Sequence, residues 1–411
     1  SAVEYSYQTL LPGMSTVTER LRYYAFHCWW LTKYADFSPT TSALEYGDFA
    51  RRFEFLYALA SLFDPSSPGR TSNELGLSGS IEATKMVKSA EDGVDFRHLT
   101  ARDTPATQRY MKPAMGDFIN TYAPQMREIG LLHRPDKHGL NVPTKTGLLL
   151  ADEFERSLGD VASMFVDAVQ AGRADRATLE ALTICAPSQI PPDGEEATML
   201  LDLLLGRLEV DPEKVPEFRQ DEAARAREAA HARRDTLLWI LETSRSNPSE
   251  ELTQEKLRWI WFNTPVSIGQ SRAYTHARWQ HYQAGDTARV TCEALLDYAV
   301  REISRGSRDL PTLLSDITHP LDQAGSLGDW LLRIEKKQSE APMRSIQHRT
   351  LDATTELDDL MGPLARLHFE WGYREGELDD AFPTEAGRQT VRNILQWMKL
   401  NEHRPARTAM A

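Results

Sequence analysis

Cysteine is scarce in this sequence. The 411 residues contain three cysteines, Cys28, Cys185 and Cys292, which lie far apart and show no spacing that is typical of a metal site. A small, odd number of cysteines does not build the disulfide framework that stabilises many small secreted domains. The cysteine content therefore predicts reduced thiols in a cytoplasmic protein.

Long hydrophobic runs are also missing, and no stretch approaches the length that is needed to cross a bilayer. The most apolar patch is Trp29-Trp30-Leu31, and its surroundings contain polar or charged residues such as His27 and Lys33. The segment Ser1-Ala-Val-Glu-Tyr5 lacks the basic and then apolar layout of a secretion signal. We therefore expect a cytoplasmic protein without membrane contact.

Common catalytic motifs are missing from the sequence. It contains no glycine-rich loop followed by a Walker lysine, no Gly-x-Ser-x-Gly, no His-Glu-x-x-His and no Cys-x-x-Cys. His276 and His281 are five residues apart, so one helix face would not present both to a metal, and we interpret them as core or hydrogen-bonded histidines. The sequence predicts no cofactor and no metal. A catalytic triad can still be scattered along a chain, so the missing motifs do not exclude an enzyme.

Positive charge is scarce overall and is concentrated in one segment. The chain has 47 Lys and Arg residues against 60 Asp and Glu residues, which gives a formal net charge of −13. Residues 95–147 nevertheless hold eight basic and five acidic residues, so this segment carries +3 and the remainder −16. An acidic body with a local basic face disfavours indiscriminate coating of nucleic acid and allows a specific or weak contact with phosphate.

The segment 118–158 contains the clearest structural pattern of the chain. Apolar residues recur at three- and four-residue steps from Phe118 to Ile129, which predicts one buried helix face. Two short strands on either side of the polar turn 133–139 predict a hairpin, and an amphipathic helix follows at 148–158. Helix, hairpin with a basic tip, and helix is the layout of a winged helix. The sequence of this segment resembles the third helix and wing of many bacterial winged-helix proteins.

Two further expectations concern this predicted winged helix. Residues 95–117 are expected to hold its earlier helices, with a turn or a helix start at Asp103-Thr-Pro105. Pro124 lies inside the helix that follows. That helix therefore either kinks at the proline or begins near Ala123, with the proline in its first turn.

A winged helix of this kind predicts a set of contact residues. If the helix enters a major groove, Asn120, Gln125 and Arg127 have suitable chemistry for base edges or phosphates. Lys137 and His138 at the hairpin tip would reach the DNA backbone or the minor groove. Winged helices also serve as protein-docking modules, so both readings stay open. The expected nucleic-acid or partner contacts are Arg20, Arg22, Arg109, Lys112, Asn120, Gln125, Arg127, Arg134, Lys137, His138 and Lys145.

The opening of the chain, residues 10–35, predicts an apolar, aromatic-rich helix after a turn at Pro12-Gly13. Arg20 and Arg22 lie near the start of this helix. They are either surface arginines of a core helix or contacts to a phosphate at the helix beginning, where backbone N–H groups point outward. Residues 11–24, LPGMSTVTERLRYY, resemble the start of a loose group of uncharacterised bacterial proteins that are often met in anti-phage defence islands. This resemblance implies a defence context and supplies no catalytic residues.

The rest of the chain predicts helices with short breaks. Arg51 and Arg52 are expected on the solvated side of their helix, and residues 402–411 are expected to fray. The predicted helices are 46–63, 161–171, 176–185, 195–208, 221–244, 253–262, a pair within 274–304 that is broken near Gly285, 327–336, 350–369 and 384–400. The predicted fold is mainly α, a helical bundle body with an embedded winged-helix domain that carries a small β-hairpin. The predicted domains are an N-terminal helical region, 1–90, the winged helix, 91–160, and a C-terminal helical domain, 161–411.

Three roles are compatible with these patterns. The first is a DNA- or partner-recognition subunit of a bacterial anti-phage defence assembly, in which catalysis resides in a partner protein such as an ATPase or effector subunit. Its ligand would be double-stranded DNA or that protein, and the chain itself could form an oligomer. The second is a metal-dependent nuclease or other hydrolase with a scattered acidic site. The third is a structural scaffold of a multisubunit complex.

Overall fold

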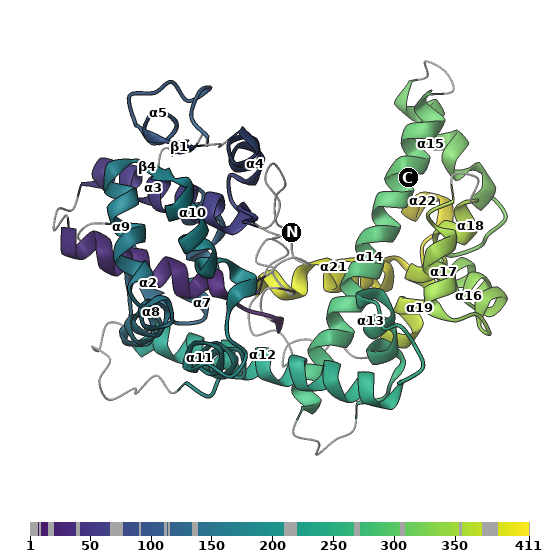
Figure 1. The fold of residues 1–411 in the computed structure, drawn as a ribbon. Helices are drawn as coiled ribbons and strands as arrows, with labels where there is room; N and C mark the ends of the chain where they lie inside the picture. The colour runs from purple at the N-terminus through teal and green to yellow at the C-terminus, as the bar shows by residue number, and fades with distance from the viewer. Residues whose placement is uncertain are drawn as a thin grey trace. The chain divides into compact units, whose positions relative to one another are not determined.

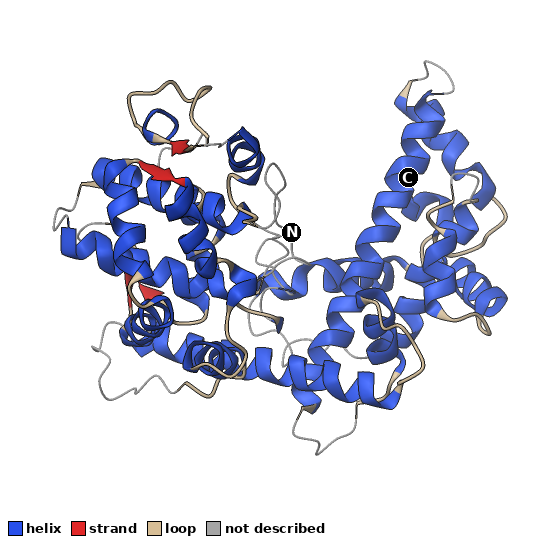
Figure 2. Ribbon diagram, viewed as in Figure 1, coloured by secondary structure: helices blue, strands red, loops and turns tan. Residues whose placement is uncertain are grey.

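The computed structural model describes residues 7, 10–14, 20–37, 42–65, 77–89, 92–110, 113, 116–133, 139–208, 220–266, 272–304, 309–352, 356–371 and 385–410. These residues are mainly helical, as predicted, and the strands among them are short (Figure 2). Packing divides the chain into two compact units. The N-terminal unit comprises Leu11–Leu237, and the C-terminal unit comprises Leu238–Ala411 together with Ser1–Leu10. The predicted boundaries after residues 90 and 160 both lie inside the N-terminal unit.

Some helices of the N-terminal unit begin at a capping side chain. Ser42 accepts a hydrogen bond from the backbone N–H of Glu45, and Asp175 accepts one from Thr178 at 2.7 Å. The helices in chain order are α2 (Arg22–Phe37), α3 (Ala43–Leu62), α4 (Ser80–Ser89), α5 (Arg97–Thr100), α6 (Phe118–Thr121), α7 (Ala123–Glu128), α8 (Lys145–Leu158), α9 (Val161–Ala171), α10 (Arg176–Leu182) and α11 (Glu195–Leu204), with single turns η1 (Thr183–Cys185) and η2 (Pro187–Gln189) (Figure 1). The long helix α12 (Gln220–Ser246) runs from this unit into the other.

Aromatic side chains fill the core of the N-terminal unit. The middle of α2 is buried on every side, because α3 and α8 cover it together with the aromatic residues of α9. Trp29 and Trp30 are fully buried, and Trp29 lies edge-on to Phe53 and Phe165 at ring distances of 5.7 and 5.4 Å. Aromatic pairs in this geometry add stabilisation beyond the apolar area that they bury. A helix whose middle is buried all round is therefore the central element of this unit.

A pair of strands that are far apart in the sequence joins two loops of the N-terminal unit. Strand β1 (Gly93–Asp95) pairs antiparallel with β4 (Arg173–Asp175), and Val94 lies opposite Ala174. Gly93 has a φ of 125°, and a Cβ there would lie 2.5 Å from the carbonyl oxygen of Ala174, so glycine is needed at this close approach. The predicted helices within 95–117 are reduced to the single turn of α5 in the described part of that segment, which is otherwise turns and coil.

The C-terminal unit has a second, separate core. Trp330, Leu331, Leu367 and Met398 are fully buried in it. Its helices in chain order are α13 (Gln254–Asn263), α14 (Ala273–Ser304), α15 (Leu310–Thr318), α16 (Leu327–Gln338), α17 (Met343–Arg349), α18 (Leu357–Leu360), α19 (Gly362–Trp371), α21 (Glu385–Asn401) and α22 (Ala406–Met410), with a single turn η5 (His319–Leu321) (Figure 1). None of the described helices in either unit is long and apolar enough to cross a membrane.

Three predictions for the C-terminal unit are wrong. Residues 274–304 form one uninterrupted helix, α14, with no break at Gly285, because a glycine is tolerated in a helix whose surroundings are packed. The segment 350–369 is not one helix: its described residues form α18 and most of α19, and α17 ends before it at Arg349. Residues 402–410 are packed and do not fray, because Pro405 forms a bridge with Ser326 and Ala406 is fully buried, while Ala411 lies outside the described residues.

Candidate functional site

The helix predicted before the hairpin is divided into two short helices next to Pro124. Helix α6 ends at Thr121, and α7 begins at Ala123 with Pro124 in its first turn, which is one of the two predicted arrangements. Phe118 and Met126 are fully buried and hold the two helices to the aromatic core. Gly130, with a φ of 79°, lets the chain reverse after α7.

The predicted hairpin is present, and its base is fixed. Strand β2 (Leu132–His133) pairs antiparallel with β3 (Val142–Pro143), and Leu132 lies opposite Pro143. Thr144 follows β3 and caps α8, since its Oγ1 accepts a hydrogen bond from Gly147 N at 3.2 Å and donates one to Gly130 O at 2.7 Å. A Cβ at position 147 would lie 2.3 Å from Leu131 O. The hairpin tip, residues 134–138, lies outside the described residues.

The structure divides the predicted contact residues into three groups. Arg20, Asn120 and Lys145 are exposed. Arg109, Gln125 and Arg127 are half-buried, and Arg127 donates a hydrogen bond from Nη1 to Asn141 Oδ1 at 2.7 Å, which ties α7 to the hairpin. The residues that lie outside the described part of the chain are Lys112, Arg134, Lys137 and His138.

Arg22 is a correction, because its guanidinium lies in the interior. The residue is 2% exposed and donates to both carboxylate oxygens of Glu196, at 2.9 and 3.0 Å. Its remaining N–H groups reach Ile184 O at 2.7 Å, Ala186 O at 2.9 Å and Ser157 Oγ at 3.1 Å. A side chain with all of its donors used inside the protein cannot meet a phosphate outside. Arg22 therefore joins α2 to the loop between α10 and α11.

Arg51 corrects a second expectation. The sequence places it on the solvated face of α3, but it is 1% exposed and donates from Nε to Thr100 O at 2.8 Å. Its Nη2 also pairs with Asp48, one turn earlier on the same helix. Arg51 thus holds the turn that follows α5 against α3.

A buried carboxylate that the sequence reading missed lies beside the start of α6. Glu54 on α3 is 3% exposed and accepts hydrogen bonds from the backbone N–H groups of Asp117 at 3.0 Å and Phe118 at 2.7 Å. The hydroxyl of Tyr110 donates to the same carboxylate at 3.2 Å. The side chain of Asp117 does not cap its own helix and instead accepts from Ser78 Oγ at 2.8 Å. Glu54, which lies on α3, therefore caps the N-terminal end of α6.

Burial in this apolar site raises the pKa of Glu54 to about 8, although the backbone N–H groups of Asp117 and Phe118 act to lower it. The signal in the sequence was a carboxyl group between Phe53 and Leu56 on the apolar part of a predicted helix. A buried carboxyl group with a raised pKa is a candidate for proton chemistry. Here its partners are backbone amides and a tyrosine, so the arrangement holds a helix start.

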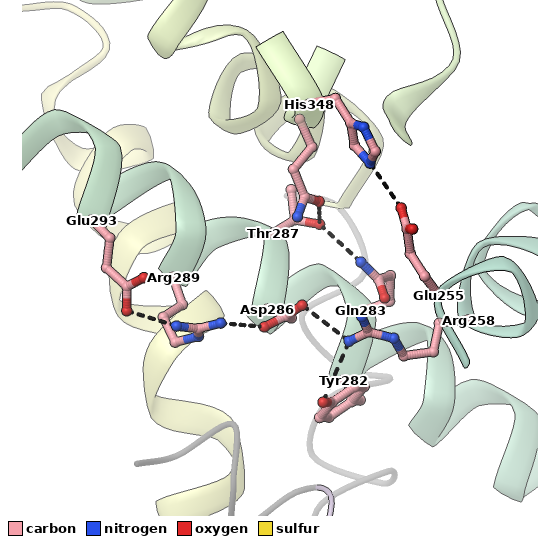
Figure 3. A network of polar contacts seen from close by, with 10 residues as sticks. Glu255, Arg258, Tyr282, Gln283, Asp286, Thr287, Arg289, Glu293 and His348 are labelled. Carbon is pink, nitrogen blue, oxygen red and sulfur yellow. Dashed lines mark hydrogen bonds and ion pairs between the residues drawn. The ribbon is translucent and has the colours of Figure 1, made fainter. Parts of the chain in front are cut away.

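The C-terminal unit contains a network of polar side chains on α13 and α14 (Figure 3). Arg258 donates to Asp286 at 3.1 Å, and Asp286 also accepts from Arg289 at 2.9 Å. Arg289 in turn donates to Glu293 at 2.6 Å. Arg258 lies 5.7 Å from the ring centre of Tyr282, close enough for a cation–π contact. Charges of alternating sign thus run along one face of α14.

A second branch of this network reaches α17 (Figure 3). Glu255 accepts from Arg344 at 3.0 Å, and His348 Nε2 lies 2.7 Å from the same carboxylate. The hydrogen bonds from His348 and Arg344 lower the pKa of Glu255. Thr287 donates to the side chain of Gln347 at 2.8 Å. These contacts bind three helices of one unit to one another.

The described residues offer little for thiol or metal chemistry. Burial raises the pKa of the Cys185 thiol to about 12 and that of the Cys28 thiol well above its usual range, so neither forms the reactive thiolate readily. Among the described residues, no group of three or more His, Cys, Asp and Glu is arranged to hold a metal ion. His276 instead lies with Nε2 2.7 Å from Trp261 O.

Comparisons with known proteins found no match: no family model, no curated protein and no solved structure is similar to this chain. The resemblance of residues 11–24 to proteins of defence islands therefore stays a prediction. The site has to be interpreted from its own geometry.

Proposed function

We propose that the chain is a recognition subunit of a bacterial anti-phage defence assembly, and that catalysis resides in a partner protein. In this proposal α7, the hairpin β2–β3 and α8 act as a winged helix that contacts double-stranded DNA. The observation that supports it most is a hairpin with a fixed base, held between two helices, whose turn contains Arg134, Lys137 and His138 in the sequence. The defence context rests on the resemblance of residues 11–24.

The geometry favours contact with phosphates over reading of base edges. Arg127 is already bonded to Asn141, which is buried, so using it on a base would break an internal hydrogen bond. Lys145 is exposed at the first turn of α8, where backbone N–H groups also favour an anion. Phosphate contacts position a protein on DNA without selecting a sequence. The proposed contact is thus salt-sensitive and weakly sequence-specific.

The test is fluorescence anisotropy of a labelled duplex titrated with the protein between 50 and 200 mM salt. Lys137→Glu and Lys145→Glu should each weaken binding, and each lost phosphate contact should reduce the slope of log affinity against log salt by about one. Arg156→Glu is the matched control, because Arg156 is exposed near the opposite end of α8. The proposal would be wrong if the protein did not bind the duplex, or if all three variants bound it equally well.

One observation favours a protein ligand as the second candidate. Leu148 and Leu149 follow Lys145 on α8 and are 46% and 48% exposed, so two neighbouring apolar side chains of the proposed winged helix offer contact area to a protein. The test is co-expression with the products of the neighbouring genes. Leu148→Asp should abolish co-purification and spare DNA binding, whereas Leu201→Asp, an equally exposed leucine on α11, should leave the complex intact.

A further inference from the structure

The turn at Leu11–Gly13 is held by three elements of the N-terminal unit. The N–H of Gly13 donates to Glu128 Oε2 at the end of α7, at 3.2 Å, and the hydroxyl of Tyr24 on α2 donates to Gly13 O. Gly13 has a φ of 75°, and a Cβ there would lie 1.8 Å from Ile129 Cγ2. Only glycine fits so close to the residue that follows α7.

The third element is α12, through Arg233. Its Nη1 donates to Pro12 O at 3.0 Å, while Nε and Nη2 donate to Leu204 O at 2.9 Å and Leu203 O at 2.8 Å. Arg233 is 1% exposed, and the ion pairs among the described residues do not include it. Burial lowers its pKa to about 10. A buried cation whose partners among the described residues are all carbonyl oxygens is a poor choice for packing alone, because an apolar side chain would avoid the desolvation.

These contacts lie close to the two points where the chain passes from one unit to the other. The chain passes between the units twice, at Leu10–Leu11 and within α12 at Leu237–Leu238. Pro12 comes directly after the first crossing, and Arg233 comes one turn before the second. Upstream of the turn, Tyr7 packs in the C-terminal unit against Trp279 and Tyr282, at ring distances of 6.3 and 6.1 Å. One arginine therefore bonds the two connecting segments to each other.

We propose that Arg233 and the Leu11–Gly13 turn form a clasp that couples α12 to α7. A displacement of α12 is passed through Pro12 and Gly13 to Glu128 and Ile129, and so to the hairpin that begins at Leu132. In this proposal, the sequence Leu11-Pro12-Gly13 forms the mechanical link between α12 and α7. The proposal does not depend on what the hairpin binds.

The first test is a double-mutant cycle between Glu128→Ala, which removes the acceptor of Gly13 N–H, and Arg233→Met, which removes the donor to Pro12 O, read by hydrogen–deuterium exchange at the amides of Met126 and Leu131. The amide of Met126 donates to Tyr122 O at the start of α7, and the amide of Leu131 donates to Met126 O after its end. Each single variant opens one end of the clasp and should speed exchange several-fold. The double variant should be no faster than the faster single variant, because the clasp is already open. Multiplying effects of the two changes would show independent sites and overturn the proposal.

The second test replaces Arg233 by methionine and follows exchange over the whole chain. Exchange should become about tenfold faster both in α7 and in residues 238–246 of α12, with α3 and α9 unchanged. The matched control is Arg51→Met, a buried arginine that also donates to a backbone carbonyl, and it should affect residues 96–101 alone. Faster exchange confined to α11 and α12, or spread evenly over every helix, would show an ordinary core residue and overturn the clasp.

Discussion

The two units bury charge in different ways. In the N-terminal unit, a few charged residues lie in an aromatic core, some of them in ion pairs, and they bond to pieces of backbone far away in the sequence. Arg22 reaches Ile184 and Ala186, and Glu54 reaches Asp117 and Phe118. In the C-terminal unit, α14 buries many polar residues between Thr275 and Thr287, and several side chains there bond to other side chains. The first pattern fixes single loops, whereas the second shares its contacts among several helices.

This difference predicts how each unit fails. Removing one of these buried charges leaves its partner unsatisfied and frees a backbone segment, so the penalty is large and local. Removing one member of a shared network leaves the others partly bonded, and some of them are open to water. Arg258 and Asp286, for example, are 19% and 10% exposed. Single substitutions should therefore cost more in the N-terminal unit than in the C-terminal unit.

The largest effect is expected for Arg22→Met. The change leaves the Glu196 carboxylate buried without its cation and frees the carbonyls of Ile184 and Ala186, which should lower the free energy of unfolding by about 3–5 kcal/mol. Urea unfolding measures this loss in the free energy of unfolding. The companion change Arg258→Met should cost roughly 1–2 kcal/mol, since its partner is partly hydrated.

A double variant, Arg22→Met with Glu196→Leu, serves as the control. It removes both charges from the site and should recover most of the lost stability. If Arg22→Met and Arg258→Met cost the same, or if the double variant is as unstable as the single one, the proposed contrast between the units is wrong.

The second prediction concerns pH and Glu54. Its pKa is about 8 in the folded protein and near 4.5 in the unfolded chain, so between these values the folded state holds a proton that the unfolded state has lost. The stability that this group contributes is fully present below pH 4.5 and is lost as pH rises through 8. The free energy of unfolding should fall by about 1.4 kcal/mol per pH unit within this window.

Glu54→Gln removes the titration and keeps an acceptor for the N–H groups of Asp117 and Phe118. Urea unfolding of wild type and variant at pH 5, 6, 7 and 8 gives the difference between their free energies of unfolding. The wild type should become less stable relative to the variant as pH rises. A constant difference across this range would show that Glu54 stays charged in the fold. Glu255→Gln is the matched control in the other unit, where the carboxyl pKa is lowered, so no loss in this window is expected.

Helices with one apolar face and a capping residue were predictable from the sequence. The predicted range 161–171 is confirmed by α9, and 253–262 by α13 with Thr253 as its cap, because period and cap act over a few neighbouring residues. The single helix α14 was not predictable in this way, since its first half is buried on all sides and has no polar face. The pairing of β1 with β4 joins residues about eighty positions apart, which no local pattern records.

The candidate site was predictable only in outline. The hairpin and the position of Pro124 follow from local turn and proline chemistry, and the structure confirms both. Which arginines face the solvent did not follow, because Arg22 and Arg51 are buried by partners remote in the sequence. A periodic pattern shows where apolar residues gather, but it does not show where a distant carbonyl or carboxylate will accept a hydrogen bond.

The third prediction sharpens the comparison inside α14. Gln280 donates from Nε2 to Trp261 O at 3.2 Å, Phe262 O at 3.2 Å and Thr264 O at 2.6 Å, and so satisfies the end of α13. Like His276, it is a buried polar residue of α14 that bonds to backbone, as the charges of the N-terminal unit do. Gln280→Leu should therefore cost about 1–3 kcal/mol in urea unfolding.

Gln283→Leu is the matched control for this change. Its Nε2 donates to a single hydroxyl, Thr287 Oγ1, at 3.4 Å, and it should cost less than about 1 kcal/mol. An equal cost for the two variants would mean that burial alone, and not bonding to backbone, sets the penalty in α14.

The smallest effect is expected at the outer end of the network, for Arg289→Gln. Arg289 is 39% exposed and pairs with Asp286 and with Glu293, which is 62% exposed, so water and salt screen both contacts. The variant should lose about 0.5–1 kcal/mol at low salt and less in 1 M NaCl. Arg301→Gln, which breaks the i,i+4 pair with Asp297, is the control and should lose about 0.3–0.5 kcal/mol. If Arg289→Gln costs as much as Gln280→Leu and salt does not change it, the alternating charges of α14 act as one buried unit. The C-terminal unit would then depend on its charges as strongly as the N-terminal unit does.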